Sequence, residues 1–330
     1  MGNALETDEI LTEIRVPPPS ENARQTFLKF RLRESVDFAM VSVATMINAT
    51  DGVCRDARIV LGAVAPTPYR VEKAEKVMSD IKASTGNNNL EIEELELGSL
   101  ASVRAFADRF LAKHDALNIL VNNAGVMACL QSKTEDGFEM QFGTNHLGHF
   151  LLTGLIAPAL LKGSPSRIVA LSSRGHQLSQ VDFEDINFDQ RDYNKWVSYG
   201  QSKTANVLHV IELERRLGNR GVHAYAVHPG VIQTELSRHM DQADFDMIIS
   251  RAGGNLKNKT IPAGAATTVY AATAPELEVR GGLYLYDCRI AEVNDDDSVL
   301  DCVRSYAVDS EAAGRLWSVS EEMVGQRFDL

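Results

Sequence analysis

A tyrosine and a lysine stand four residues apart at Tyr199 and Lys203, downstream of an apolar run that ends at Ser173. Residues with this spacing on a helix point the same way. A cation beside a phenol favours the phenolate and lowers the phenol's pKa, and such a phenol can exchange a proton with an alcohol or carbonyl oxygen. A serine hydroxyl can help to hold that oxygen. The pattern predicts an enzyme that transfers a hydride at a C–OH/C=O pair.

Helices and strands must alternate to position these residues. After residue 70 the patterns predict helices at 72–83, 99–114, 138–161, 196–217 and 263–272, and strands at 90–97, 118–122, 167–172, 222–227 and 282–286. This alternation predicts an α/β domain with a doubly wound parallel sheet and right-handed crossovers. Ligands bind at the carboxyl ends of such strands, where Asn122, Ser173 and Pro229 fall. Three separate segments should therefore meet at one crevice.

The pattern of predicted secondary structure differs before residue 70. Strand-like runs lie at 11–16, 26–32, 39–49 and 57–64, with turns at 17–20 and 48–52. We therefore predict two parts, a small β-rich or α+β appendage over 1–70 and the α/β domain over 71–330.

Composition excludes several classes of partner. The net charge of -12 argues against nucleic acid and against an anionic membrane surface. The longest apolar stretch, 150–161, is too short to span a bilayer. No signal peptide is expected, and the four cysteines lack a C-x-x-C pair. Together these features predict a cytoplasmic protein. A metal site is not expected either, because no carboxylate or cysteine is spaced to join His146, His149 and His176 as a ligand.

From about residue 71 the chain resembles the short-chain dehydrogenase/reductases, in particular the retinol-dehydrogenase-like and protochlorophyllide-reductase-like branch. Five motifs in the family's order carry this resemblance, namely Asn122-Asn-Ala-Gly125, Asn145 in Thr-Asn-His-Leu-Gly-His-Phe, Ser173 in Leu-Ser-Ser, the Tyr199/Lys203 pair, and Pro229-Gly230 with Thr234. Each motif alone is weak, and the order and spacing over the domain are specific.

The resemblance implies a role for each residue. Tyr199 would be the general acid/base, and Ser173 would hydrogen-bond the substrate oxygen. Lys203 would hold the nicotinamide ribose, and Asn145 would anchor a water in a proton relay. NAD or NADP would be bound by Tyr199 and Lys203 together with Glu96, Asn122, Ala124, Gly125, Pro229, Gly230 and Thr234. The choice between the two cofactors stays open.

Substrate and assembly are less defined. The family's substrate-covering loop corresponds to 235–260, where Met240, Phe245, Met247, Ile248 and Ile249 suggest a small apolar alcohol or carbonyl compound. Helices equivalent to the one that carries Tyr199 often mediate dimers in the family, so a homo-oligomer is a further expectation.

The chain departs from the family at its beginning. The family opens with a strand, a glycine-rich turn and a helix, which bind the pyrophosphate. The glycines before Gly98 are Gly2, Gly52, Gly62 and Gly86, and no two are close enough to build that turn. We therefore expect a Rossmann-like sheet without its first βα unit. An alternative interpretation stays open, in which the chain is a fusion product or pseudoenzyme that keeps the catalytic tetrad, Asn145, Ser173, Tyr199 and Lys203, without binding cofactor or having activity.

Residues 8–78 resemble another family. The runs 37–43, 51–56 and 61–68 are similar to the C-terminal domain of the flavoprotein (medium) subunit of carbon-monoxide and xanthine dehydrogenases. That domain is not the main flavin-binding part of its subunit, so FAD is not implied. The two resemblances together predict a fusion, in which a flavoprotein-like segment is joined to a dehydrogenase-like segment at a seam near residues 69–74. An accessory piece of a molybdenum hydroxylase is a third reading, which would require partner subunits.

Overall fold

The computed structural model describes residues 23–30, 41–50, 53–62, 69–70, 72–87, 89–232, 234–237, 239–251, 254 and 258–330. The chain divides into two compact units, Met1–Glu93 and Glu94–Leu330. The predicted strand at 11–16 lies outside the described residues. Among the described residues, every helix is too short or too polar to cross a bilayer.

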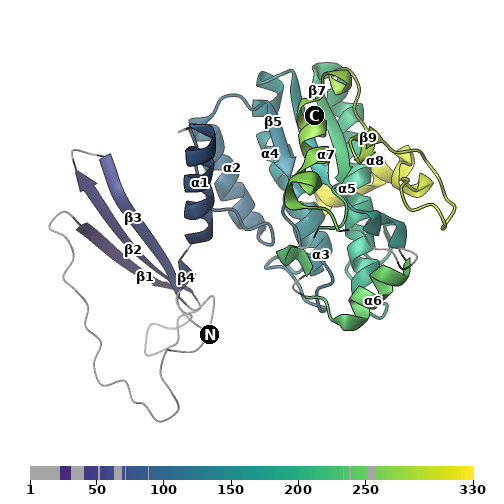
Figure 1. The fold of residues 1–330 in the computed structure, drawn as a ribbon, viewed down its shortest axis with the longest axis horizontal. Coiled ribbons are helices and arrows are strands. Elements are labelled where there is room, and N and C mark those ends of the chain that lie inside the picture. Colours follow the sequence, from purple (N-terminus) through teal and green to yellow (C-terminus); the bar gives the residue numbers. More distant parts are fainter. Residues whose placement is uncertain are drawn as a thin grey trace, which may run out of the picture. The chain divides into compact units, whose positions relative to one another are not determined.

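The first unit contains an antiparallel sheet followed by a helix (Figure 1). The strands are β1 (Ala23–Phe30), β2 (Val41–Thr50), β3 (Val53–Gly62) and β4 (Tyr69–Arg70), in the order β1-β2-β3-β4, and the helix is α1 (Glu72–Thr85). The β-rich character predicted for this part of the chain is confirmed, and so is the helix predicted at 72–83.

The second unit is a five-stranded, mostly parallel sheet between helices (Figure 1). Its strands are β5 (Ile119–Asn122), β6 (Ser166–Leu171), β7 (Val222–His228), β8 (Leu283–Tyr286) and β9 (Arg289–Ile290), of which only β9 is antiparallel. Its main helices are α2 (Leu100–Lys113), α4 (Gly148–Lys162), α5 (Lys195–Leu217), α6 (Gln242–Arg251), α7 (Ile261–Thr273) and α8 (Ser310–Val324). The predicted fold class is confirmed.

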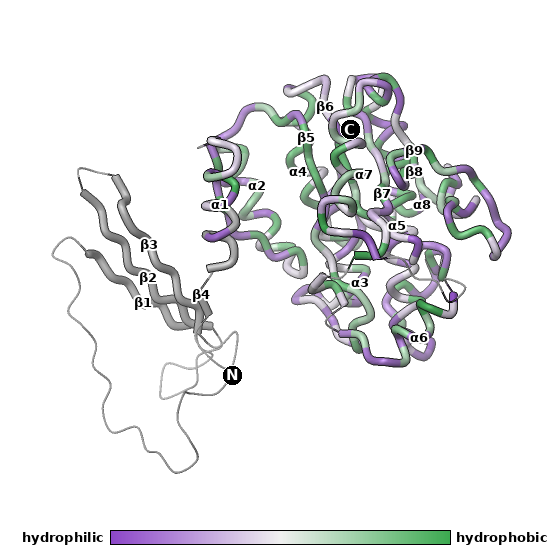
Figure 2. The backbone as a smooth tube through the Cα atoms, in the orientation of Figure 1, coloured by the Kyte–Doolittle hydropathy of each residue, from purple (hydrophilic) through white to green (hydrophobic). Residues whose placement is uncertain are grey.

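The helices cover the sheet in layers. Helices α4 and α5 pack on one face and α7 packs on the other, while α2 packs on α4 and α8 packs on α5. Hydrophobic residues are concentrated on the central strands and on α4 (Figure 2). This agrees with the rule that parallel strands buried on both faces are apolar along their length. The sheet thereby holds the carboxyl ends of β5, β6 and β7 side by side.

The strand predicted at 90–97 does not form. These residues carry no regular structure, and β5 is the edge of the described five-stranded sheet. Among the described residues, no strand pairs with the free edge of β5, so residues 90–97 lack a strand ladder to join. The alternating side chains Ile119 and Val121 on β5 are accordingly 41% and 40% exposed.

The long helix predicted at 138–161 is interrupted. It consists of α3 (Met140–Phe142), a π-helical turn at Gly143–Leu147 and α4. Single π turns are frequent at functional sites, and this one contains Asn145. Helices α6 and α8 and strand β9 were not predicted.

Close packing makes Gly148 necessary at the start of α4. A Cβ built there would collide with the backbone carbonyl of Leu97, and the backbone cannot move aside cheaply. We expect Gly148→Ala to lower the free energy of unfolding by about 1–3 kcal/mol, as over-packing does. Gly314, in α8, has nothing within 4 Å of a built Cβ. Gly314→Ala should therefore raise stability by about 1 kcal/mol, and urea unfolding of both variants measures the contrast. Equal effects would contradict the packing argument.

Candidate functional site

A cavity of about 730 Å³ opens at the carboxyl ends of β5, β6 and β7. Its walls come from the segments that follow these strands, from α5, and from α6 and α7. This is the edge at which ligands bind in sheets of this topology. The cavity lies within the volume range of small-molecule and cofactor sites, about 300–1,000 Å³.

Ser173, Tyr199 and Lys203 all line this cavity. Helix α5 carries Tyr199 and Lys203, and it begins where the side chain of Asn194 accepts hydrogen bonds from the first backbone N–H groups. Both side chains are almost fully buried. The Lys203 ammonium donates to the Leu171 carbonyl at 3.0 Å and lies 5.6 Å from the centre of the Tyr199 ring. The geometry thus brings a phenol, a cation and a hydroxyl to one place.

The expectation that Lys203 lowers the pKa of Tyr199 is wrong for this structure. Burial raises the pKa of Tyr199 to about 12, and a hydrogen bond with Ser173 offsets only part of this rise. Burial also lowers the pKa of Lys203 to about 8. Loss of hydration disfavours the charged form of each group, and the ammonium is directed at the Leu171 carbonyl. The phenol is therefore protonated at neutral pH.

Asn145 lies beneath the cavity wall and not in it. Its amide donates to the Val126 carbonyl at 2.9 Å and to the Ser202 hydroxyl at 2.9 Å, and its oxygen accepts from the Val126 N–H at 2.8 Å. A Cβ built on Gly125 would stand 2.8 Å from that amide oxygen. Asn145 therefore fixes the segment after β5 against α5, and this segment requires a glycine at its closest approach.

The other predicted cofactor residues divide into two groups. Ala124, Gly125, Pro229, Gly230 and Thr234 line the cavity. Asn122 is buried below it and donates to the Thr153 hydroxyl at 3.0 Å. Glu96 also lies outside the cavity wall, and its carboxylate accepts the Gly98 N–H at 2.9 Å. The segment that carries Glu96 is the one in which the predicted strand is not formed.

The sequence predicted only part of the apolar wall. Met247 and Ile248 of α6 line the cavity, whereas Phe245 and Ile249 are 39% and 38% exposed on the outer side of that helix. Gln177 and Leu300 also line it and were missed. They had no local signal, because Gln177 comes from a short 3-10 helix, Arg174–Leu178, and Leu300 from a distant loop.

Comparisons with known proteins agree with this geometry. A family model for short chain dehydrogenases matches residues 61–244, and one for the CO dehydrogenase flavoprotein C-terminal domain matches residues 26–86. The chain is similar to mouse retinol dehydrogenase 12, with 41% identity over 259 residues, covering 78% of this chain and 77% of the relative.

Two further relatives extend the comparison. The short-chain dehydrogenase/reductase prx1 of Penicillium rubens is 36% identical over 310 residues, covering 92% and 91% of the two chains. The solved structure of an uncharacterized protein from Mycobacterium paratuberculosis is 34% identical, with a TM-score of 0.57 over 76% of this chain and 82% of that one. The chain therefore belongs to the short-chain dehydrogenase family, and its relatives include proteins of the retinol-dehydrogenase type.

Proposed function

We propose that the chain is an NAD(P)-dependent oxidoreductase that interconverts an apolar alcohol and its carbonyl compound. The observation that carries this proposal is the meeting of Ser173, Tyr199 and Lys203 in one cavity, in a chain of the short-chain dehydrogenase family. These groups can hold a substrate oxygen and move a proton at it.

The residues around Lys203 fit the nicotinamide end of the cofactor. Gly125 lines the cavity, and a Cβ built on it would stand 2.8 Å from the Asn145 amide oxygen and 3.6 Å from the Lys203 Nζ, so only a glycine lets the backbone come this close to the ammonium. Pro229, Gly230 and Thr234 form another part of the wall. NAD(P), when bound, accepts or supplies the hydride. The sequence lacks the glycine-rich turn for the pyrophosphate, so affinity at that end must come from other groups.

Each side chain has one task in this proposal. The Ser173 hydroxyl donates to the substrate oxygen and orients it. Tyr199 donates its proton to that oxygen during carbonyl reduction, and burial keeps the phenol protonated for this step. The Lys203 ammonium balances negative charge that develops on the phenol oxygen. Asn145 acts on the site through the backbone of Val126, and the water relay predicted for it stays a prediction.

An apolar substrate is supported by the cavity and by the relatives. Met247, Ile248 and Leu300 offer hydrocarbon surface next to the polar groups, and several relatives at about 40% identity bear the name retinol dehydrogenase. Helix α8 packs along α5 and buries Leu316 and Trp317. A homo-oligomer would therefore need a surface other than α5. The cytoplasmic location stays a prediction.

The fusion reading is a proposal as well. The two family matches overlap between residues 61 and 86, around the proposed seam near 69–74 and the proposed boundary between 70 and 71. The flavoprotein-like part would then supply no flavin chemistry of its own.

A titration with NADH and with NADPH, followed by nicotinamide fluorescence, tests cofactor binding. We expect saturable binding that Gly125→Val abolishes, because its side chain would displace Asn145 and with it the cavity wall beside Lys203. Gly314→Ala is the matched control, since nothing lies within 4 Å of its built Cβ, and it should bind like the unmodified chain. Absence of binding up to millimolar cofactor would reject the proposed function and favour the cofactor-deficient fusion product.

A further inference from the structure

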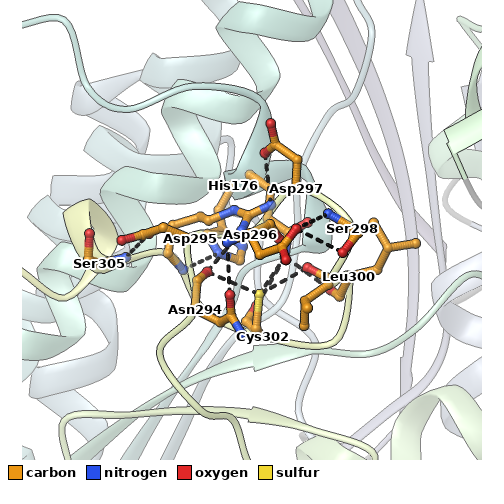
Figure 3. A network of polar contacts seen from close by, with 12 residues as sticks. His176, Asn294, Asp295, Asp296, Asp297, Ser298, Leu300, Cys302 and Ser305 are labelled. Atoms are coloured by element: carbon orange, nitrogen blue, oxygen red, sulfur yellow. Dashed lines mark hydrogen bonds and ion pairs between the residues drawn. The ribbon is translucent and has the colours of Figure 1, made fainter.

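A loop far from the predicted motifs is built around a buried arginine. We call residues 294–304, which lie between β9 and α8, the clasp. The Arg304 guanidinium donates to the carbonyls of Asn294 at 2.9 Å and Asp296 at 2.8 Å, and to the Asp297 carboxylate at 3.2 Å (Figure 3). Only 3% of the residue is exposed. A buried cation needs its donors satisfied, so Arg304 fixes the shape of the clasp.

The acidic side chains of the clasp serve its own backbone. Asp295 accepts the Ser305 N–H at 2.9 Å, and Asp296 accepts the Ser298 N–H at 2.8 Å. The Cys302 thiol donates to the Val299 carbonyl at 3.1 Å. Several of these contacts are drawn in Figure 3. The carboxylates therefore stabilise the loop conformation by accepting hydrogen bonds from its own backbone.

The clasp is bonded to the segment that follows Ser173. The Arg304 backbone N–H donates to Nε2 of His176 at 3.2 Å, and Gln177 donates to the Leu300 carbonyl at 3.0 Å. The Arg174 guanidinium pairs with Asp301 at 2.6 Å. Three of the five residues after Ser173 are thus held by the clasp.

His176 connects the clasp to Ser173 itself through two hydrogen bonds. Because the Arg304 N–H can only donate, Nε2 of His176 must present its lone pair. The hydrogen is therefore on Nδ1, which lies 2.8 Å from the Ser173 carbonyl. His176 is completely buried, and burial lowers its pKa to about 4. A neutral imidazole in one tautomer thus links the backbone of the clasp to the backbone of Ser173.

We propose that His176 is a positioning residue through which the clasp holds Ser173, and that Leu300 of the clasp shapes the substrate end of the cavity. The inference rests on the proposed function. Ser173 lies at the reacting end and Leu300 lines the same cavity. The clasp would then act on turnover through His176 and on substrate fit through Leu300.

Two substitutions at His176 separate its two bonds. In His176→Asn the amide N–H can replace Nδ1–H toward Ser173, whereas in His176→Gln the amide oxygen can replace Nε2 toward Arg304. We expect each variant to lower kcat about 10- to 100-fold, because each breaks the link between the clasp and Ser173 at one end, and a misplacement of 1 Å can cost about 10²-fold. The Kd for NADPH should not change in either variant.

Leu300→Ala is the companion variant for substrate fit. We expect it to raise the KM for retinal several-fold while kcat is kept. A kcat that is kept in either His176 variant, or losses of kcat that follow the melting temperatures of the two variants, would show a merely structural histidine and overturn the proposal. An unchanged KM in Leu300→Ala would overturn the specificity role.

A second measurement does not depend on turnover. Long-range ¹H–¹⁵N spectra of the full chain report which ring nitrogen of His176 carries the hydrogen, with His176→Gln assigning the signal. We expect the Nδ1–H tautomer, unprotonated throughout the neutral range. An Nε2–H tautomer, or protonation near the ordinary histidine pKa, would break the link to Ser173. If the unmodified chain lacks turnover, the proposed function fails, and this spectrum still decides the role of His176.

Discussion

Replacing Tyr199 with phenylalanine is expected to lower kcat for carbonyl reduction by about 10²–10⁴-fold, the contribution typical of a positioned general acid. The substitution removes one oxygen from a side chain that is 3% exposed and lines the cavity. Burial raises the pKa of this phenol to about 12, so the group lost is a protonated donor. The Kd for NADPH should stay the same, because the ring itself remains.

Tyr225→Phe is the matched control for this experiment. Tyr225 is also fully buried, but it lies outside the cavity wall and donates its hydroxyl to the Leu277 carbonyl at 2.5 Å. We expect that variant to lose about 1–3 kcal/mol of stability, from the unsatisfied carbonyl, and to retain kcat. Steady-state rates with retinal and NADPH compare the two. If Tyr199→Phe kept full activity, proton transfer by Tyr199 would be ruled out.

Replacing Lys203 with methionine is expected to stabilise the fold while abolishing activity. Burial lowers the pKa of Lys203 from 10.5 to about 8, so the folded state binds its proton less tightly than the unfolded state does. The resulting penalty is fully present below about pH 8 and disappears as the pH rises through 10.5. At about 1.4 kcal/mol per pKa unit, it amounts to about 3 kcal/mol at pH 7.

Methionine should fill the site without leaving a polar group unsatisfied. The Leu171 carbonyl that accepts from Lys203 also accepts from Asn206 at 2.9 Å. Activity should be lost because the cation beside Tyr199 is gone. Stabilising an active site at the expense of function is a common trade-off.

Urea unfolding at pH 7 and at pH 10.5 provides the measurement. The gain in Lys203→Met should be about 3 kcal/mol at the lower pH and much smaller at the higher one. Lys162→Met is the control, since the Lys162 side chain is 62% exposed and pairs with an exposed Asp115. It should change stability little at either pH. A loss of stability in Lys203→Met at pH 7 would mean that the ammonium is adequately solvated in the folded state.

The sequence predicted those parts of the molecule that local patterns determine. The helix that carries Tyr199 and Lys203 has a capping asparagine and a long amphipathic run, and it forms as expected. The strand at 90–97 has an equally suggestive pattern and does not form. A strand depends on its neighbours for hydrogen bonds, and no pattern within those residues reports whether a neighbour exists.

The same distinction holds within the site. Motifs close in sequence located Ser173, Tyr199 and Lys203, whereas Arg304 meets His176 across a separation of 128 residues. The pKa of Tyr199 could not be read from the spacing of Tyr199 and Lys203, because burial, which the spacing does not report, raises it. Asn145 was found by its motif, but its orientation toward Val126 depends on the π-helical turn.

The two tryptophans of the chain give it two independent optical reporters. Trp196 lines the cavity edge-on to Tyr199, with ring centres 6.3 Å apart, and its N–H donates to Asp244 of α6 at 2.9 Å. Trp317 is buried on α8 and stacked on His209. Reduced nicotinamide absorbs where tryptophan emits, so energy transfer from Trp196 would signal occupancy of the cavity. Emission from Trp317 would instead signal the docking of α8, so ligand entry and unfolding can be followed in one cuvette.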